Sequence, residues 1–419
     1  MRWLISTAFS ITRMHTPTQE SKGGIAVGLK VLMIGPYPLE PGMVRGGIEA
    51  VTSALVPALA AQDDIDKVSV LRFHHGEAST DHRRVGPKVD VYYVRGQDRF
   101  TTVTGSFLDV RKARKLVAEL KPDVVHGQEI GWYGDIAAKC SPNSVVTVHG
   151  LPQVEIRLSA RTTFRDKLRV IPVDALVRRV LRRAKVVISI SKYDTQELGR
   201  LIQGTTVSIA NPTASEFFAL APPRPSEPRL LFAGVLSSLK NPVGLLNAFA
   251  QVRQAVPEAR LILAGAHPDP DYAQTVHDRV ANLGLGDSVD IVGLLDSDRL
   301  RHEIASARAI VLFSRQENSP TIIAQAMAAA KPVVATRVGS VPEMVNDGES
   351  GFVVESEDET AMAERMRTLL EDQELCLRMG ARGHELALGR FNPEAVARQT
   401  VQAYRTALNS QQPNHSFAR

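Results

Sequence analysis

Short apolar runs alternate with helical patterns along most of the chain. Several runs are apolar throughout and have the length of a strand, which is typical of strands covered on both faces in a parallel sheet. In the first half the predicted strands are residues 30–35, 68–73, 89–94, 124–126, 145–149 and 186–190. In the second half they are residues 230–233, 261–264, 289–292, 309–313, 332–336 and 352–354. The alternation predicts an α/β fold with helices on both faces of parallel sheets.

The helical patterns lie between these strands. The predicted helices are residues 48–61, 107–120, 192–201, 242–256, 271–283, 298–307, 321–330 and 393–408. A Pro-rich polar segment, APPRPSEPR, interrupts the alternation at residues 221–229 and indicates a linker between two domains. We therefore predict an N-terminal extension (1–29), an N-domain (30–215), a linker (216–228), a C-domain (229–390), and a last helix with a loose tail (391–419).

Both predicted domains are doubly wound. Ligands of such sheets bind beyond the carboxyl ends of the strands, so two of these domains facing one another would form an interdomain cleft.

The stretch AIVLFSRQENSPTIIAQAMAAAKPVVATRVGSVPE, residues 309–343, carries the strongest candidate chemistry. A buried strand leads through a polar loop into an Ala-rich helix and then into a second strand. Ser319 is predicted to cap this helix with Pro320 at its first position, which would present free N–H groups beyond the strand end. Such a helix start is a ready anion site. Glu317 precedes it, and Gln325 lies about two turns into the helix.

The ends of the chain and its cysteines narrow the class of protein. No apolar run approaches the roughly 20 residues of a membrane span. The opening MRWLISTAFSITRMHTPTQESKGG lacks a long apolar region followed by a small-residue cleavage site, so we expect an extension rather than a signal peptide. Cys140 and Cys376 lie in different halves and predict neither a disulfide framework nor a cysteine metal cluster. We expect a cytoplasmic protein.

Charge differs between the halves of the chain. Residues 1–215 hold 30 Lys and Arg against 20 Asp and Glu, while the rest holds 20 against 25. Much of the excess lies in the stretch from Arg157 to Lys185, where basic residues interleave with apolar ones at helical spacing. This stretch could lie on anionic lipid, or it could be a core-packed helix with a basic solvated face. Nucleic acid is not expected as a partner, because the sequence has no recognised binding motif and few aromatic residues.

Several motifs together resemble the retaining glycosyltransferases of family 4, which have the GT-B architecture of two facing Rossmann-like domains. The matching stretches of the C-domain are FAGVLSSLKNPVGLLNAF, LILAG, VDIVGLL and residues 309–343. Weaker matches upstream are GGIEAV, PDVVHGQE, TVHG, VVISIS and ANPT. They occur in the family's order over most of residues 30–390, which makes the resemblance specific.

The resemblance implies roles for a lysine and an acid of the C-domain. Lys240 follows the turn after the first strand of that domain and would hold the diphosphate of a nucleotide sugar; the alternative is a surface lysine. Glu317 matches the first of the family's two glutamates and would accept hydrogen bonds from the donor sugar, although an acid before a helix start is also favourable by itself. The family usually has an arginine where this chain has Val235. We expect the helix start, Arg315 or Arg337 to replace it, or the activity to be weaker.

The second family glutamate, which binds ribose, is Gln325 here. An amide can still bond ribose hydroxyls, though a structural glutamine is the alternative. Because this stretch resembles the donor site, its residues Asn318, Ser319, Pro320 and Thr321 are also predicted to bind substrate.

The N-domain matches the family at two further places. His149 with Gly150 matches the His-Gly signature at the donor sugar, where a neutral imidazole could donate a hydrogen bond; a strand-end histidine satisfied by backbone is the alternative. Gly46 and Gly47 match the loop at which backbone approaches donor phosphates or acceptor. His126, at another strand end, is expected to be structural.

The remaining clusters predict no further chemistry. The loop HPDPDY contains His267 and Asp269 but has no second group of metal ligands by spacing, and the chain has no Asp-x-Asp motif. We expect no metal and no cofactor.

The resemblance implies retaining transfer of a sugar from a UDP- or GDP-sugar to an acceptor hydroxyl of a glycan or a lipid-linked precursor, with the basic stretch at an anionic membrane surface. A GT-B epimerase or phosphorylase, or a silent sugar-nucleotide binder, are the alternatives.

Overall fold

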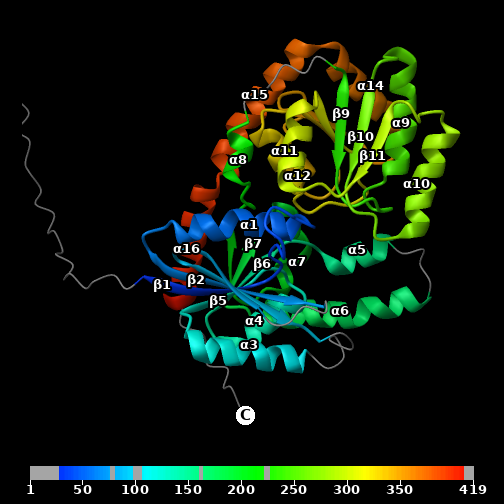
Figure 1. The fold of residues 1–419 in the computed structure, drawn as a ribbon. Coiled ribbons are helices and arrows are strands. Elements are labelled where there is room, and N and C mark those ends of the chain that lie inside the picture. The colour runs from blue at the N-terminus through cyan, green and yellow to red at the C-terminus, as the bar shows by residue number, and fades with distance from the viewer. Residues whose placement is uncertain (1–27, 76–80, 98–105, 160–163, 221–226, 410–419) are drawn as a thin grey trace, which may run out of the picture.

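The computed structural model describes residues 28–75, 81–97, 106–159, 164–220 and 227–409. Residues 1–27 of the predicted N-terminal extension, residues 221–226 of the predicted linker and the tail 410–419 lie outside the described residues. Figure 1 shows two α/β domains, one above the other, each built on a twisted sheet flanked by helices. The prediction of two Rossmann-like domains is confirmed.

The N-domain sheet has eight strands in the order β3-β4-β2-β1-β5-β6-β7-β8. Their bounds are β1 Leu29–Ile34, β2 Ile65–His74, β3 Asp81–Gly86, β4 Val89–Arg95, β5 Val124–Gly127, β6 Ser144–Val148, β7 Val186–Ser189 and β8 Thr205–Ser208. Every pairing is parallel except that of β3 with β4, which is antiparallel. The carboxyl ends of the central strands therefore meet at one edge of the sheet.

The C-domain sheet has six strands, all parallel, in the order β11-β10-β9-β12-β13-β14. Their bounds are β9 Arg229–Ala233, β10 Arg260–Ala264, β11 Val289–Gly293, β12 Ala309–Leu312, β13 Val333–Thr336 and β14 Gly351–Val354. Most of their residues are fully buried, as the continuous apolar runs predict.

Helices cover both sheets. Those of the N-domain are α1 Gly47–Ala60, α3 Phe107–Leu120, α4 Trp132–Cys140, α5 Pro152–Ser159, α6 Phe164–Arg183 and α7 Lys192–Leu198. The short α8 Ser215–Phe218 follows them and packs on the C-domain, where Phe217 joins the apolar core. Those of the C-domain are α9 Pro242–Ala255, α10 Pro270–Asn282, α11 Ser297–Ser306, α12 Thr321–Ala328, α13 Val341–Met344, α14 Glu359–Glu371 and α15 Gln373–Arg390. None of the described helices is both long enough and apolar enough to cross a bilayer.

Two strands lack the apolar signal by which the others are predicted. Strand β3 has the sequence DHRRVG and is mostly exposed, and β8 is mostly exposed as well. Both lie at edges of the sheet, where one face and one row of backbone groups stay in water, so their sequences need no apolar run. Strand β3 is an exception within the predicted parallel sheet, because it forms an antiparallel hairpin with β4.

The last helix, α16 (Pro393–Asn409), returns to the N-domain. It packs beside α1 on one face of the first sheet, and Val396, Val401 and Tyr404 join the apolar core there. In Figure 1 this red helix runs down the side of the lower domain. The chain therefore crosses between the domains twice, and the backbone N–H of Thr213 at the first crossing donates to the carbonyl of Phe391 at the second, at 2.9 Å.

The basic stretch from Arg157 to Lys185 forms parts of α5 and α6. In the last turns of α6, Val177, Val180 and Leu181 are buried in the core beneath the sheet. On the same helix Arg179 bonds the buried Asp135 of α4 at 2.8 Å. This part of the stretch is thus a core-packed helix with a basic solvated face. Residues 160–163 lie outside the described residues.

Candidate active site

A cavity of about 1050 Å³ lies between the two domains, at the carboxyl ends of both sets of strands. Its walls hold residues of both domains, among them all ten residues proposed from the sequence. These are Gly46, Gly47, His149, Lys240, Glu317, Asn318, Ser319, Pro320, Thr321 and Gln325. The fold therefore collects into one place positions that are up to 279 residues apart in sequence.

An ion pair forms the centre of the C-domain wall. The Lys240 ammonium lies 2.6 Å from Oε1 of Glu317, and the same oxygen accepts from the Ser314 hydroxyl at 2.7 Å. Glu317 is 5% exposed, whereas the lysine side chain is about a quarter exposed. A buried carboxylate is stable here because a cation and a hydroxyl replace the water it has lost.

Two local features of the backbone fix the positions of Lys240 and Glu317. Asn241, directly after Lys240, has φ 50° and caps α9 with its side chain, accepting from the N–H of Gly244 at 3.2 Å. On the other side, Gly339 has φ +53°, and a Cβ there would lie 1.5 Å from the carbonyl oxygen of Glu317. Only glycine lets the β13–α13 loop support the loop of Glu317 this closely.

Helix α12 begins at Thr321, where the predicted helix 321–330 begins, but its cap differs from the predicted one. Its N-cap is Pro320, with an extended backbone (ψ 117°) and no side-chain hydrogen bond. The predicted cap by Ser319 is wrong, since that hydroxyl points instead to the sulfur of Met344 at 3.8 Å. The helix start still faces the cavity, which Pro320, Thr321 and Ile322 line.

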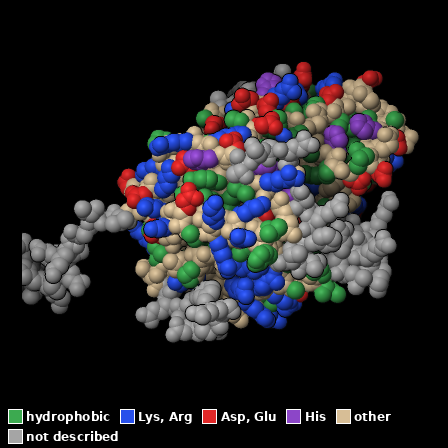
Figure 2. All heavy atoms as spheres, turned by 60° about the horizontal axis from the view of Figure 1, so that its bottom comes forward, with side chains coloured by type: hydrophobic (Ala, Val, Ile, Leu, Met, Phe, Trp, Pro, Cys, Tyr) green, Lys and Arg blue, Asp and Glu red, His purple; other side chains and the backbone are tan. Residues whose placement is uncertain are grey.

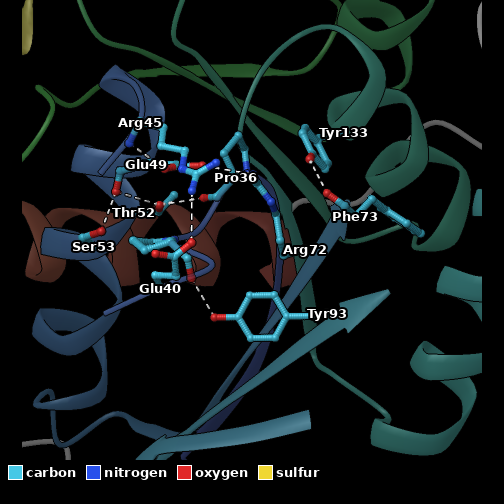
Figure 3. A network of polar contacts seen from close by, with 11 residues as sticks. Pro36, Glu40, Arg45, Glu49, Thr52, Ser53, Arg72, Phe73, Tyr93 and Tyr133 are labelled. Carbon is cyan, nitrogen blue, oxygen red and sulfur yellow. Dashed lines mark hydrogen bonds and ion pairs between the residues drawn. The ribbon is translucent and has the colours of Figure 1, made fainter. Parts of the chain in front are cut away.

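The glycine loop of the N-domain is held by a buried acid in the first turn of α1. Glu49 accepts from the backbone N–H of Arg45 at 2.8 Å and pairs with Arg72 of β2 at 3.0 Å (Figure 3). The Thr52 hydroxyl donates to the carbonyl of Pro36 at 2.7 Å, at the other end of the loop. The loop is thereby fixed at both ends, with Gly46 and Gly47 on the cavity wall.

Gly47 also brings the two domains together. A Cβ at this position would lie 3.7 Å from the side chain of Thr321, so the starts of α1 and α12 face one another across the cavity.

His149 follows β6 and is held as a neutral imidazole. Nε2 lies 2.7 Å from the amide oxygen of Gln128, and Nδ1 is buried without a hydrogen bond among the described residues. Burial lowers the pKa of His149 to about 4, although the nearby Asn211 amide opposes this. Since Nε2 carries the proton toward Gln128, Nδ1 offers an acceptor, where the sequence led us to expect a donor.

His126 has a structural role, as expected. The ring is fully buried and bonds the Tyr404 hydroxyl of α16 at 2.9 Å and the Thr147 hydroxyl at 2.7 Å. Burial lowers the pKa of His126 to about 3. It therefore ties α16 to the sheet rather than facing the cavity.

Glu129 is a cavity residue that the sequence did not single out. It has φ 154°, an unusual conformation for a residue with a side chain, and its carboxylate accepts from the N–H of Tyr133 at 3.0 Å. Burial, and then the charge of Glu155, raise the pKa of Glu129. Both acids line the N-domain side of the cavity. The only sequence signal is the position of Glu129 just after a strand end.

The cations expected to replace the arginine at Val235 do not reach the cavity. Arg315 bonds Glu357 and the carbonyl of Ser238, and Arg337 bonds Glu355 at 2.7 Å, so both belong to surface pairs. The alternative that Arg315 or Arg337 replaces this arginine is therefore wrong, while a larger role of the helix start and a weaker activity stay predictions. Among the described residues, the arginines on the cavity wall are Arg45 and Arg301.

The acidic loop near His267 has a local role. Asp269 caps α10 by accepting from the N–H groups of Asp271 and Tyr272. Within the described residues no group of three or more His, Cys, Asp or Glu side chains could hold a metal ion.

Two facing Rossmann-like domains with a ligand-sized cleft between them define the GT-B architecture. Solved structures of this fold resemble the chain. Sucrose-phosphate synthase from Thermosynechococcus elongatus matches with a TM-score of 0.77 and 23% identity over 90% of this chain and 98% of its own. Anabaena Alr3699/HepE, solved in complex with UDP-glucose, matches with a TM-score of 0.68 and 18% identity over 90% of this chain and 100% of its own.

Family models give the particular family. Residues 45–212 match Glycosyltransferase Family 4, and residues 215–386 match Glycosyl transferases group 1. The chain belongs to this family of glycosyltransferases.

Curated relatives match over part of their length. N-acetyl-alpha-D-glucosaminyl L-malate synthase of Bacillus anthracis is 30% identical over 183 residues, which is 44% of this chain and 46% of the relative. A D-inositol 3-phosphate glycosyltransferase of Segniliparus rotundus is 32% identical over 188 residues, 44% of this chain and 41% of the relative. These matches span less than half the length of either relative.

Proposed function

We propose that this protein transfers a sugar, with retention of anomeric configuration, from a nucleoside diphosphate sugar to an acceptor hydroxyl. The observation that carries the proposal is the Lys240–Glu317 pair beside the start of α12, on the wall of an interdomain cavity. A cation and a helix start suit a diphosphate, while a carboxylate suits sugar hydroxyls. The complex of Anabaena HepE with UDP-glucose supports a nucleotide sugar as donor.

In the proposed reaction the donor separates the ion pair. The diphosphate lies against Lys240 and the start of α12, and the sugar hydroxyls donate to Glu317. The bond from the anomeric carbon to the diphosphate breaks as the acceptor oxygen bonds the same face of that carbon. The acceptor proton passes to the departing phosphate oxygen, so the products are the glycosylated acceptor and a nucleoside diphosphate.

The negative charge that develops on the leaving diphosphate is stabilised by groups of the protein that are already positioned beside it. Lys240 and the N–H groups of α12 are fixed before the bond breaks, which is the arrangement that stabilises a transition state most strongly. Since these groups neutralise the diphosphate, the proposed reaction requires no divalent metal. The imidazole of His149 is neutral because its pKa is lowered, and its Nδ1 accepts a hydrogen bond from a hydroxyl of the sugar or of the acceptor.

We propose that the acceptor is lipid-linked and that the protein lies on the cytoplasmic side of an anionic membrane. The outer face of the N-domain supports this proposal. Figure 2 shows Lys and Arg side chains gathered on the face that holds α3 and α6. Where the structure describes the side chains of these helices, the exposed basic residues are Arg111, Lys112, Arg114, Lys115, Arg178, Arg182 and Arg183. Phe107, Leu108 and Ile171 are exposed apolar side chains on the same two helices. Basic and apolar groups together favour an anionic bilayer surface.

Vesicle sedimentation tests this surface. The protein should sediment with vesicles that contain anionic phospholipid and be released by salt, and the double variant Arg182→Glu/Arg183→Glu should bind less. Arg367→Glu, at an exposed position of α14 in the C-domain, is the control. Equal sedimentation of both variants would contradict the proposed surface.

A donor screen tests the activity. The protein is incubated with UDP- and GDP-sugars, and both free nucleoside diphosphate and the anomeric configuration of the product are followed. Release of nucleoside diphosphate with a retained product supports the proposal. Donor binding without turnover would favour the silent binder suggested by Val235 and Gln325, and an isomerised donor sugar would favour an epimerase.

A further inference from the structure

The cavity faces a seam of hydrogen bonds that crosses from one domain to the other. We propose that Asn318 and Glu343 of the C-domain are positioning residues, which latch the domains so that Glu317 and His149 face the same sugar. This inference rests on the proposed function and adds to it the groups that set the closed geometry.

Asn318 is 7% exposed, and both polar atoms of its side chain are bonded to the N-domain. Nδ2 donates to the carbonyl of Val148 at 3.3 Å, and Oδ1 accepts from the Ser191 hydroxyl at 3.2 Å. Asn318 directly follows Glu317, and Val148 directly precedes His149. One side chain therefore joins the backbone on either side of the cavity next to the two residues proposed to hold the donor sugar.

Glu343 makes a second crossing nearby. Its two carboxylate oxygens accept from consecutive backbone N–H groups at the start of α7, Lys192 at 2.9 Å and Tyr193 at 3.0 Å. A carboxylate on the first N–H groups of a helix is favoured both by the hydrogen bonds and by the helix dipole. Glu343 of the C-domain thus caps the start of α7, a helix of the N-domain.

The two crossings meet at Ser191. Its hydroxyl donates to Asn318 while it accepts from the N–H of Asp194 as the N-cap of α7. The Ser340 hydroxyl donates to the carbonyl of Asn318, so the N-cap residue of α13, the helix that contains Glu343, also supports the loop of Asn318. Since α7 can receive both contacts only when the domains are together, these bonds favour the closed form.

A merely structural interface and a positioning latch have different kinetic consequences. Loss of interface packing would lower the melting temperature and leave the chemistry of folded protein unchanged. Loss of a latch would leave nucleotide binding, which involves the C-domain wall, nearly unchanged. It would lower kcat and let water reach the donor, so a larger fraction of donor would be hydrolysed rather than transferred.

The first test compares Asn318→Ala, Ser191→Ala and the double variant. Ser191→Ala should lower kcat by roughly tenfold, the order expected for one lost buried hydrogen bond, and Asn318→Ala, which removes both bonds of its side chain to the N-domain, by at least as much; KM for the donor should stay within about twofold. The double variant should lose little more than Asn318→Ala, since the bond between the two side chains is already absent there. Glu385→Ala, which removes an exposed surface pair of the C-domain, is the control and should match wild type. Unchanged kcat and hydrolysed fraction in both single variants would overturn the proposal.

The second test does not need turnover. In Glu343→Ala, hydrogen exchange at the backbone N–H of Lys192 and Tyr193 should accelerate, while that of Asp194, bonded within its own domain, should not. Unchanged exchange at both sites would overturn the latch. If wild type turns over no donor, the proposed function fails, and exchange at these two sites still decides for or against the latch.

Discussion

The two walls of the cavity are built in different ways. In the C-domain wall, the polar residues proposed to hold the donor are buried: Glu317, Asn318 and Gln325, all in the stretch after β12, are less than a tenth exposed. The N-domain wall includes the loop after β1, residues of α1 and α5 and the ends of β5 and β6, and its Glu155 is exposed. Buried polar groups suit the constant part of a substrate, for which we propose the nucleotide sugar, whereas exposed groups on separate loops suit a variable acceptor.

The largest expected effect lies in the C-domain wall. Lys240→Ala and Glu317→Ala should each lower kcat/KM by about a hundredfold, because each variant lacks a charged side chain that is proposed to contact the donor. Steady-state kinetics with the donor found in the screen measures this. Glu385→Ala serves as the surface control, and rates at the wild-type level in both variants would contradict the assignment of this wall to the donor.

His149 should have a smaller effect, since it is one uncharged contact of the N-domain wall. His149→Ala should lower kcat by roughly tenfold, the order of one lost hydrogen bond. Because burial lowers the pKa of His149 to about 4, this ring stays neutral above pH 5 and should add no ionisation to the pH–rate profile between pH 5.5 and 8. An ionisation in that range that disappears in the variant would contradict the neutral role.

The same difference between the walls explains how much the sequence could predict. The strands of both sheets and the cluster around Glu317 are local patterns, because a buried parallel strand is apolar throughout and the next loop carries its polar residues. The antiparallel β3 and the return of α16 to the N-domain are not local. Glu129 was missed because its backbone conformation and burial depend on α4 and α5, and Ser319 was misplaced as a cap because Met344 lies beside it only in the folded chain.

Gln325 offers a way to sharpen the comparison. Gln325→Glu restores the charge that the family has at the second acid position and should raise affinity for the nucleotide by about threefold, the order of one stronger, charge-assisted hydrogen bond. Isothermal titration with UDP or GDP measures it. A loss of affinity would indicate that the amide of Gln325 donates to the nucleotide in this protein.

The last expected effect concerns the pH dependence of stability and His126, which lies outside the cavity. Its pKa of about 3 in the folded protein lies below the ordinary value, so the unfolded chain binds a proton first as pH falls. As pH falls from 6.5 to about 4, the titration of His126 in the unfolded chain lowers the free energy of unfolding by roughly 1.4 kcal/mol for each pH unit. In denaturant unfolding, His126→Asn should be less stable than wild type at pH 7, and the gap should narrow toward pH 4. A constant gap would contradict the buried neutral state.

The most direct test of the account is isothermal titration of wild type and Lys240→Ala with the UDP- and GDP-sugars. The account predicts that wild type binds one of these donors at a single site and that the variant loses most of that affinity. Equal affinity in the two proteins, or no binding of any donor by wild type, would contradict the assignment of the interdomain cavity to a nucleotide sugar.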